Sequence, residues 1–88
     1  MGSVNKGIVF NQEKFRKFLV NNEMSYKDFC QVNKKPFRIN PAYLSVMVNN
    51  KKPAGRLIRG KIMMAINKIN AMNRLPAESV EQYFSLGE

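Results

Sequence analysis

The chain has 88 residues, with 15 Lys and Arg against 6 Asp and Glu and a formal net charge of +9. A chain of this length can bury one small hydrophobic core and has little structure left for a deep catalytic cleft. Hydrophobic residues make up 44% of the chain, which is typical of a folded domain and too high for a disordered basic tail. We therefore expect one small, strongly basic, folded domain.

Several classes of protein are disfavoured by what the sequence lacks. No stretch approaches the roughly 20 apolar residues of a membrane span, and the N-terminus does not follow the pattern of a secretory signal, so we expect a cytoplasmic protein. There is no histidine and only one cysteine, Cys30, which removes the usual zinc and Cys-His schemes. Gly55 and Gly60 lack the spacing of a phosphate-binding loop. We expect no enzymatic activity, no metal and no cofactor, and we interpret Cys30 as a small core residue.

Charge is unevenly distributed along the chain. No acidic residue occurs between Phe29 and Ala77, a stretch that holds most of the lysines and arginines, whereas the acids lie at the two ends. A block of one sign favours an anionic partner, nucleic acid first and an anionic membrane surface second. The alternative is a generally basic composition, which does not explain why the acids are segregated.

Residues 1–10 are interpreted as an N-terminal tail, whose Met1-Gly2-Ser3 start looks like a cloning scar, and residues 11–87 as the domain. We find no repeat and no low-complexity segment. No convincing strand is predicted, unless residues 8–10 pair with another segment.

Two helices are predicted in the first third of the chain. The apolar spacing in residues 11–20 is typical of an amphipathic helix with Asn11 as its N-cap. Ser25 and Asp28 have the spacing of a capping box, which predicts a short helix over residues 26–33.

The middle of the chain carries the clearest helix start. Asn is a preferred N-cap and Pro fits the first helical position, so Asn40-Pro41 predicts a helix that continues to Val48. In the basic loop before it, Phe37 and Ile39 are expected to pack into the core. Beyond a turn, apolar spacing predicts a long helix over residues 56–71.

A last helix is predicted over residues 77–86, with Val80, Tyr83 and Phe84 on one face. The sum is an all-α domain of five helices. Two short helices in a basic block, the second with a strong start signal, are typical of a helix-turn-helix.

Three segments resemble the Cro and phage-repressor family of the xenobiotic-response-element type. Residues 24–30 resemble the opening of its helix-turn-helix, residues 44–54 its recognition helix and following loop, and residues 79–87 its fifth helix. The resemblance implies a five-helix DNA-binding domain over residues 11–87. The chain departs from the family between Cys30 and Leu44, where the connection is longer and lacks the usual turn glycine.

Position by position, the resemblance implies that the third helix reads base edges in the major groove, through Asn40, Ala42, Tyr43, Ser45, Val46 and Asn49. Asn40 or Asn49 can pair with adenine, and Ala42 and Val46 can contact thymine methyl groups. No Arg or Gln lies on this face, so direct readout leans towards A and T, with the remaining specificity left to DNA shape.

Residues around this helix are expected to bind backbone phosphates, which position a protein without reading sequence. Tyr26 stands where the family has a phosphate-binding residue, and the full set is Tyr26, Lys27, Lys34, Lys35, Arg38, Lys51, Lys52, Arg56 and Arg59.

Some of these assignments have structural alternatives. Tyr43 can be half-buried core, and Val46 can be core if the helix is rotated by one position. Three methionines are interpreted as packing residues, Met63, Met64 and Met72. Apolar residues near both ends are candidates either for a dimer surface or for the core of one copy: Ile8, Val9, Phe10, Val80, Tyr83, Phe84 and Leu86.

The sequence thus favours a transcriptional regulator that binds double-stranded DNA sequence-specifically, a phage or mobile-element repressor that occupies an operator as a homodimer. Two alternatives stay open. One is an interaction protein, an antirepressor or inhibitor, that uses the same fold to bind a protein partner. The other is a sequence-indifferent nucleic-acid binder.

Overall fold

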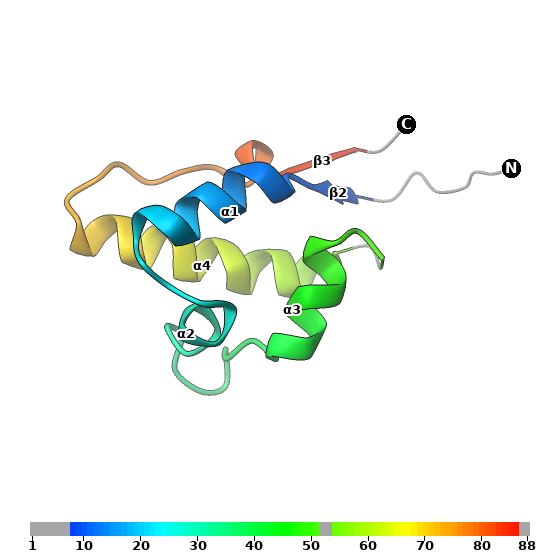
Figure 1. The fold of residues 1–88 in the computed structure, drawn as a ribbon, viewed down its shortest axis with the longest axis horizontal. Coiled ribbons are helices and arrows are strands. Elements are labelled where there is room, and N and C mark those ends of the chain that lie inside the picture. Colours follow the sequence, from blue (N-terminus) through cyan, green and yellow to red (C-terminus); the bar gives the residue numbers. More distant parts are fainter. Residues whose placement is uncertain (1–7, 52–53, 87–88) are drawn as a thin grey trace, which may run out of the picture.

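The computed structural model describes residues 8–51 and 54–86 of the chain. These residues are mostly helical, with four α-helices, one turn of 3-10 helix and a two-stranded sheet (Figure 1). In chain order the elements are β2 (Ile8–Phe10), α1 (Gln12–Asn21), α2 (Tyr26–Cys30), α3 (Pro41–Val48), α4 (Arg56–Met72), η1 (Val80–Gln82) and β3 (Phe84–Leu86).

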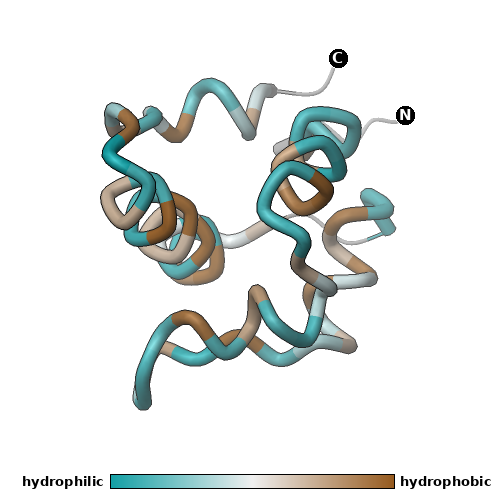
Figure 2. The backbone as a smooth tube through the Cα atoms, turned by 60° about the vertical axis from the view of Figure 1, so that its left-hand side comes forward, coloured by the Kyte–Doolittle hydropathy of each residue, from teal (hydrophilic) through white to brown (hydrophobic). Residues whose placement is uncertain are grey.

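The long helix α4 is the element around which the others are arranged. Figure 1 shows α1 on one side of α4 and the pair α2 and α3 on the other, with the small sheet near one end. Hydrophobic and hydrophilic stretches alternate along the helices in Figure 2, because each helix turns one face to the core and one to solvent. None of the described helices is long and apolar enough to cross a bilayer.

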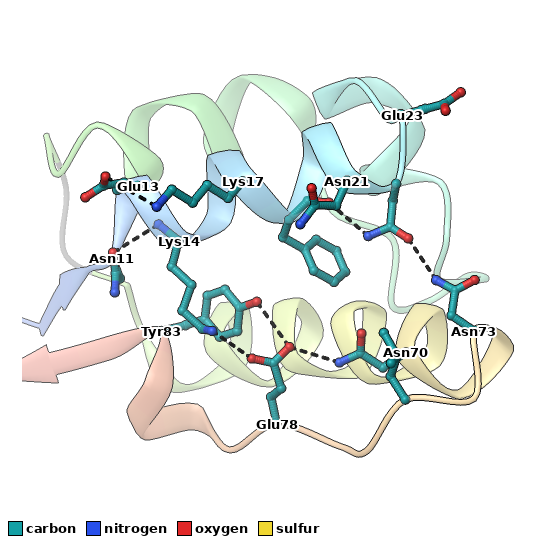
Figure 3. A pocket seen from close by; sticks show the side chains of 13 residues that line it. Asn11, Glu13, Lys14, Lys17, Asn21, Glu23, Asn70, Asn73, Glu78 and Tyr83 are labelled. Carbon is teal, nitrogen blue, oxygen red and sulfur yellow. Dashed lines mark hydrogen bonds and ion pairs between the residues drawn. The ribbon is translucent and has the colours of Figure 1, made fainter.

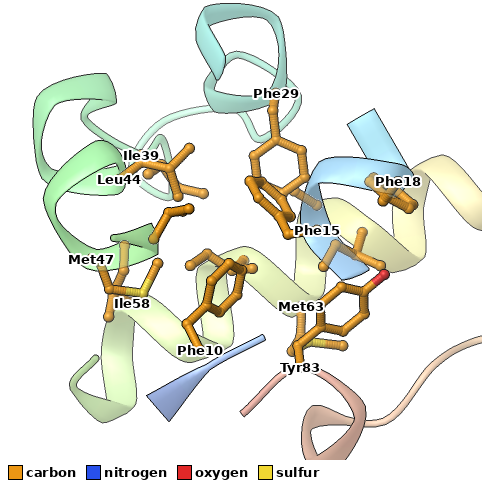
Figure 4. Packing of buried hydrophobic residues seen from close by; sticks show 14 of the residues in the cluster. Phe10, Phe15, Phe18, Phe29, Ile39, Leu44, Met47, Ile58, Met63 and Tyr83 are labelled. Atoms are coloured by element: carbon orange, nitrogen blue, oxygen red, sulfur yellow. The ribbon is translucent and has the colours of Figure 1, made fainter. Parts of the chain in front are cut away.

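The core is built around a chain of aromatic rings. Phe15 on α1 meets Phe10 of β2 at 5.2 Å and Phe29 of α2 at 4.9 Å between ring centroids, both edge to face. Figure 4 shows these rings in the space that β2, α1, α2 and α4 enclose. Leu44 and Met47 of α3 extend the same core.

The helix starts agree with their local sequence signals. The Asn11 and Asn40 side chains accept hydrogen bonds from the first turns of α1 and α3. Ser25 and Asp28 form the reciprocal capping box of α2. Helix α2 ends at Cys30, however, and not near residue 33 as predicted.

The connection between α2 and α3 is anchored by a buried asparagine. Asn33 is 1% exposed, and its Nδ2 donates to the carbonyl oxygens of Phe37, at 3.1 Å, and Lys61, at 2.9 Å. The second bond ties the loop to the N-terminal half of α4. Ile39 packs into the core as predicted, whereas the prediction for Phe37 is wrong because its side chain is 47% exposed.

The prediction of a fifth helix is also wrong. A capping box at Ser79 and Gln82 starts a single 3-10 turn, but the chain then runs into β3. Tyr83 accepts a hydrogen bond from the Asn11 N–H at 2.7 Å, and Phe84 pairs with Phe10 across the antiparallel sheet. Backbone groups that would continue a helix are used in this pairing.

Both strands of the sheet come from segments with a different predicted role. Residues 8–10 lie within the expected tail, but they pair with residues 84–86 as β2, which confirms the one strand that the sequence left open, and Phe10 is 2% exposed. Residues 1–7, with the expected scar, lie outside the described part of the chain. Phe10, Tyr83 and Phe84, candidates for a dimer surface, are core residues, whereas Val9 and Val80 are exposed. The structure describes the backbone of Ile8 and Leu86 but not their side chains.

Candidate nucleic-acid interface

Helix α3 has a buried and an outward face. Leu44, Met47 and Val48 are buried in the core. The predicted base-reading residues Ala42 and Asn49 are exposed, and Ser45 and Val46 are half-buried. The face that the sequence analysis assigned to DNA is therefore the one that α3 turns away from the core.

Two of the predicted reading residues, Tyr43 and Asn40, lie at the start of α3. Tyr43 is 37% exposed. The Asn40 Oδ1 accepts from the N–H groups of Ala42 and Tyr43, at 2.8 and 3.3 Å, as the N-cap of the helix. The oxygen of Asn40 is thereby used within the protein, and its Nδ2 is the group left to donate to a base.

Asn49 connects the end of α3 to the start of α1. Its Nδ2 donates to the Ser45 carbonyl at 2.8 Å, and its Oδ1 accepts from Gln12 Nε2 at 2.7 Å. Gln12 is thus a polar residue of this face that sequence reasoning missed. No local signal could have found it, because its place depends on how the fold brings the start of α1 to the end of α3. Glutamine, like asparagine, can make two hydrogen bonds to adenine in the major groove.

The predicted phosphate-binding residues fall into two groups. Six are exposed, namely Lys27, Lys34, Lys35, Arg38, Lys51 and Arg56. Two are engaged within the protein. Tyr26 is half-buried and packs against Phe15 at 6.1 Å, and Arg59 donates through Nη1 to the Ala54 carbonyl at 2.8 Å. Lys52 lies outside the described residues.

The structure brings two of these cations together with two predicted reading residues. Arg38, Asn40, Tyr43 and Arg56 line one pocket of about 420 Å³ where the loop before α3 meets the start of α4. Predicted phosphate-binding and predicted base-reading residues thus lie together at one edge of the α3 face.

A larger groove of about 880 Å³ lies elsewhere, between α1, the last turns of α4 and the chain that leads to Tyr83 (Figure 3). Its centre is the Glu78 carboxylate, which pairs with Lys14 Nζ at 3.0 Å and accepts from Asn70 Nδ2 at 3.0 Å. The Tyr83 hydroxyl donates to the same carboxylate at 3.5 Å. The backbone of Glu78 is bound as well, since the Asn67 side chain pairs with its N–H and carbonyl.

Protonation at this groove follows from these contacts. Burial alone would raise the pKa of Glu78, but hydrogen bonds from Asn70 and Lys14 and the charge of Lys14 hold it below its ordinary value of 4.5. Burial and the Glu78 carboxylate raise the pKa of Tyr83, so its hydroxyl stays a donor. An ionised Glu78 fixed by three partners joins α1, α4 and the C-terminal segment, which is a structural role.

The remaining reactive groups have structural places too. Burial raises the pKa of the Cys30 thiol to about 11, and the side chain is 2% exposed, as expected for a core cysteine. Met63 is buried as predicted, whereas Met64 and Met72 are exposed. Within the described part of the chain, no three His, Cys, Asp or Glu side chains are grouped to hold a metal ion.

Comparisons with models of protein families, with curated proteins and with solved structures find no match for this chain.

Proposed function

We propose that this protein is a transcriptional regulator that binds double-stranded DNA sequence-specifically and acts by occupying an operator. The observation that carries the proposal is the outward face of α3, where Ser45 and Asn49, in a stretch of chain without acidic residues, and the adjoining Gln12 of α1 present polar groups. Hydrogen-bonding side chains on the exposed face of a short helix match what major-groove readout requires.

The arrangement of α2 and α3 supports the same function. The two helices pack against each other, and α3 is held by the core on one side only. The resemblance to the Cro and phage-repressor family assigns α3 to the major groove and α2 to the DNA backbone. Where that family has a fifth helix, this chain has η1 and β3, and neither element contains a proposed reading residue.

Phosphate neutralisation would supply most of the affinity. Lys27 of α2, Lys51 after α3 and Arg56 at the start of α4 are exposed cations around the proposed reading face. Such contacts make binding steeply salt-dependent and leave discrimination to the few side chains that reach base edges. An operator-binding regulator of this size would bind two half-sites as a homodimer, and the exposed Val9 and Val80 are candidates for its contact.

The test is a selection from random double-stranded oligonucleotides with the purified protein at about 150 mM salt, where weak phosphate binding is largely screened. We expect a short motif with two-fold symmetry, rich in A and T. Ser45→Ala with Asn49→Ala should remove the motif, whereas Val20→Ala, at an exposed position of α1, should keep it.

Two results would contradict the proposal. Enrichment without a motif would indicate a sequence-indifferent nucleic-acid binder. A motif that survives the double substitution would place the reading face elsewhere on the molecule.

A further inference from the structure

The pocket at the junction of α3 and α4 is lined by apolar as well as cationic side chains, whereas a DNA phosphate would use only the cations. Apolar groups of Ile39, Tyr43, Leu57 and Ile58 contribute to it, together with the cations of Arg38, Arg56 and Lys61, Gly55 and Asn40. It has no acidic lining residue. A concave site with apolar walls and convergent charges of one sign matches a ligand that has both an apolar group and negative charge.

Leu57 is the most exposed large hydrophobic side chain among the described residues, at 81%. It occupies the second position of α4 and lines the pocket. Met64 lies two turns further along the same face and is 43% exposed. Apolar surface beside a pocket is typical of a place where another protein binds.

Gly60 lies on this face, between Leu57 and Met64. It occupies the interior of α4, where glycine lowers helix stability. A Cβ built there would meet nothing within 4 Å, so the packing of this chain does not require glycine at this position. The open space over Gly60 lets the backbone of a partner approach α4 closely.

We propose that the pocket binds an acidic protein segment that inserts a large apolar side chain between Tyr43 and Leu57. Carboxylates of the segment would pair with Arg38, Arg56 and Lys61, while its apolar side chain covers Leu57 and Ile58. Charge complementarity selects this occupant. The α4 helix of a second copy would not fit, because it carries Arg56, Arg59, Lys61 and Lys68 and no acid.

DNA fits the pocket less well than a protein segment does. Phosphates would satisfy the three cations but would leave Leu57 and Ile58 without an apolar partner. Ser45 and Asn49 do not line the pocket, but Arg38, Asn40, Tyr43 and Arg56 do, so a protein segment bound here would compete with a duplex for these four contacts. The proposal is carried by the apolar lining around Leu57 and does not depend on the proposed DNA binding.

The experiment is a selection from a displayed library of random peptides against the full chain, followed by affinity measurements for the selected peptides. We expect peptides rich in Asp and Glu with one or two large apolar residues. Leu57→Gln should weaken their binding at least about tenfold, as removal of a central apolar contact does. Lys61→Gln should weaken it less and reduce its salt dependence.

Val20→Gln is the matched control, because Val20 is a 71% exposed apolar residue on α1 and does not line the pocket. The Val20→Gln variant should bind the selected peptides with the same affinity as the unchanged protein. Leu57→Gln should keep the thermal stability of the chain, since the side chain is exposed and glutamine suits a helix. Its affinity for a duplex should change less than about twofold, since no charge is altered.

Three results would overturn the proposal. The first is a selection without acidic peptides. The second is peptide binding that Leu57→Gln and Val20→Gln affect equally. The third is a duplex that displaces the peptides and loses affinity itself on Leu57→Gln, which would make the pocket part of the DNA footprint.

Discussion

Asn50, two residues beyond the end of α3, is bound through its side-chain amide to the backbone of Phe10 in β2. The Asn50 Oδ1 accepts from the Phe10 N–H at 2.9 Å, and Nδ2 donates to the Phe10 carbonyl at 3.4 Å. Asn50 also adopts a φ of 59°, and its N–H closes the end of α3 on the Met47 carbonyl. One residue thus ends α3 and fixes that end to the sheet.

Asn50→Gly separates these two roles. Glycine keeps the left-handed conformation but has no amide to pair with Phe10, so we expect the free energy of unfolding to fall by about 1–2 kcal/mol. Urea unfolding followed by circular dichroism measures this change.

Glu23 and Arg74 provide the control, because they end α1 and α4 with φ values of 53° and 60°. Both are exposed, and their conformation is one that side chains other than Asn disfavour. Glu23→Gly and Arg74→Gly should each stabilise the protein by about 0.5–1 kcal/mol. If Asn50→Gly stabilised the protein as these two substitutions do, the hydrogen bonds between the Asn50 amide and the Phe10 backbone would contribute nothing to stability.

The loop between α2 and α3 gives a second prediction on stability. Ile39 is 4% exposed and Phe37 is 47% exposed. Ile39→Ala should lower the free energy of unfolding by about 2–4 kcal/mol through lost burial and a cavity. Phe37→Ala should change it by less than about 0.5 kcal/mol. Equal losses in thermal unfolding for the two variants would show that both side chains pack into the core.

The contrast between these neighbours shows what sequence could predict about the fold. The starts of α1, α2 and α3 were predictable because Asn11, Ser25 and Asn40 act on backbone groups within three positions. Phe37 and Ile39 have similar local patterns, and the loop path that separates them depends on Asn33 reaching the backbone of α4. The strand conformation of Phe84 could not be predicted locally either, because it depends on pairing with Phe10 at the other end of the chain.

The candidate site likewise has residues that local sequence predicts and residues that only the tertiary fold brings together. The outward position of Ser45 and Asn49 followed from helical periodicity around the buried Leu44 and Met47. Gln12 could not be predicted, since it joins this face only because the fold brings the start of α1 to the end of α3. The apolar pocket around Leu57 required the same tertiary knowledge, because its walls come from a loop and two helices.

Cys30 should be unreactive in the folded protein. Its thiol is buried, and burial raises its pKa to about 11, so the reactive thiolate is scarce at neutral pH. A chromophoric disulfide reagent should label Cys30 slowly in buffer and rapidly in concentrated urea. Equal rates in the two conditions would place Cys30 at the surface.

The Glu78 carboxylate should make stability depend on pH in the acidic range. Because the folded protein holds its pKa below 4.5, the stabilisation by the ionised group is complete above that pH and is lost as pH falls through the folded-state value. Glu78→Gln should lower the free energy of unfolding at neutral pH by about 1–2 kcal/mol. It should also flatten the fall in stability below pH 4.5.

Glu13→Gln is the control for this effect. Glu13 pairs with Lys17 at 3.7 Å on the surface of α1, where both side chains are largely exposed. Such a pair contributes little, so its removal should change stability by less than about 0.5 kcal/mol and should leave the acid dependence in place. Thermal unfolding across the acidic range distinguishes the two variants, and identical profiles would contradict the role of Glu78.

The salt dependence of DNA binding locates the phosphate contacts. Lys51 is exposed directly after α3, whereas Lys17 lines the groove around Glu78 and is bound to Glu13. Each lost phosphate contact lowers the slope of log affinity against log salt by about 0.9. Lys51→Gln should show this decrease in fluorescence anisotropy titrations with a selected duplex. Lys17→Gln removes the same charge and should leave the slope unchanged. A decrease of the same size in both variants would mean that the duplex does not lie along the α3 face.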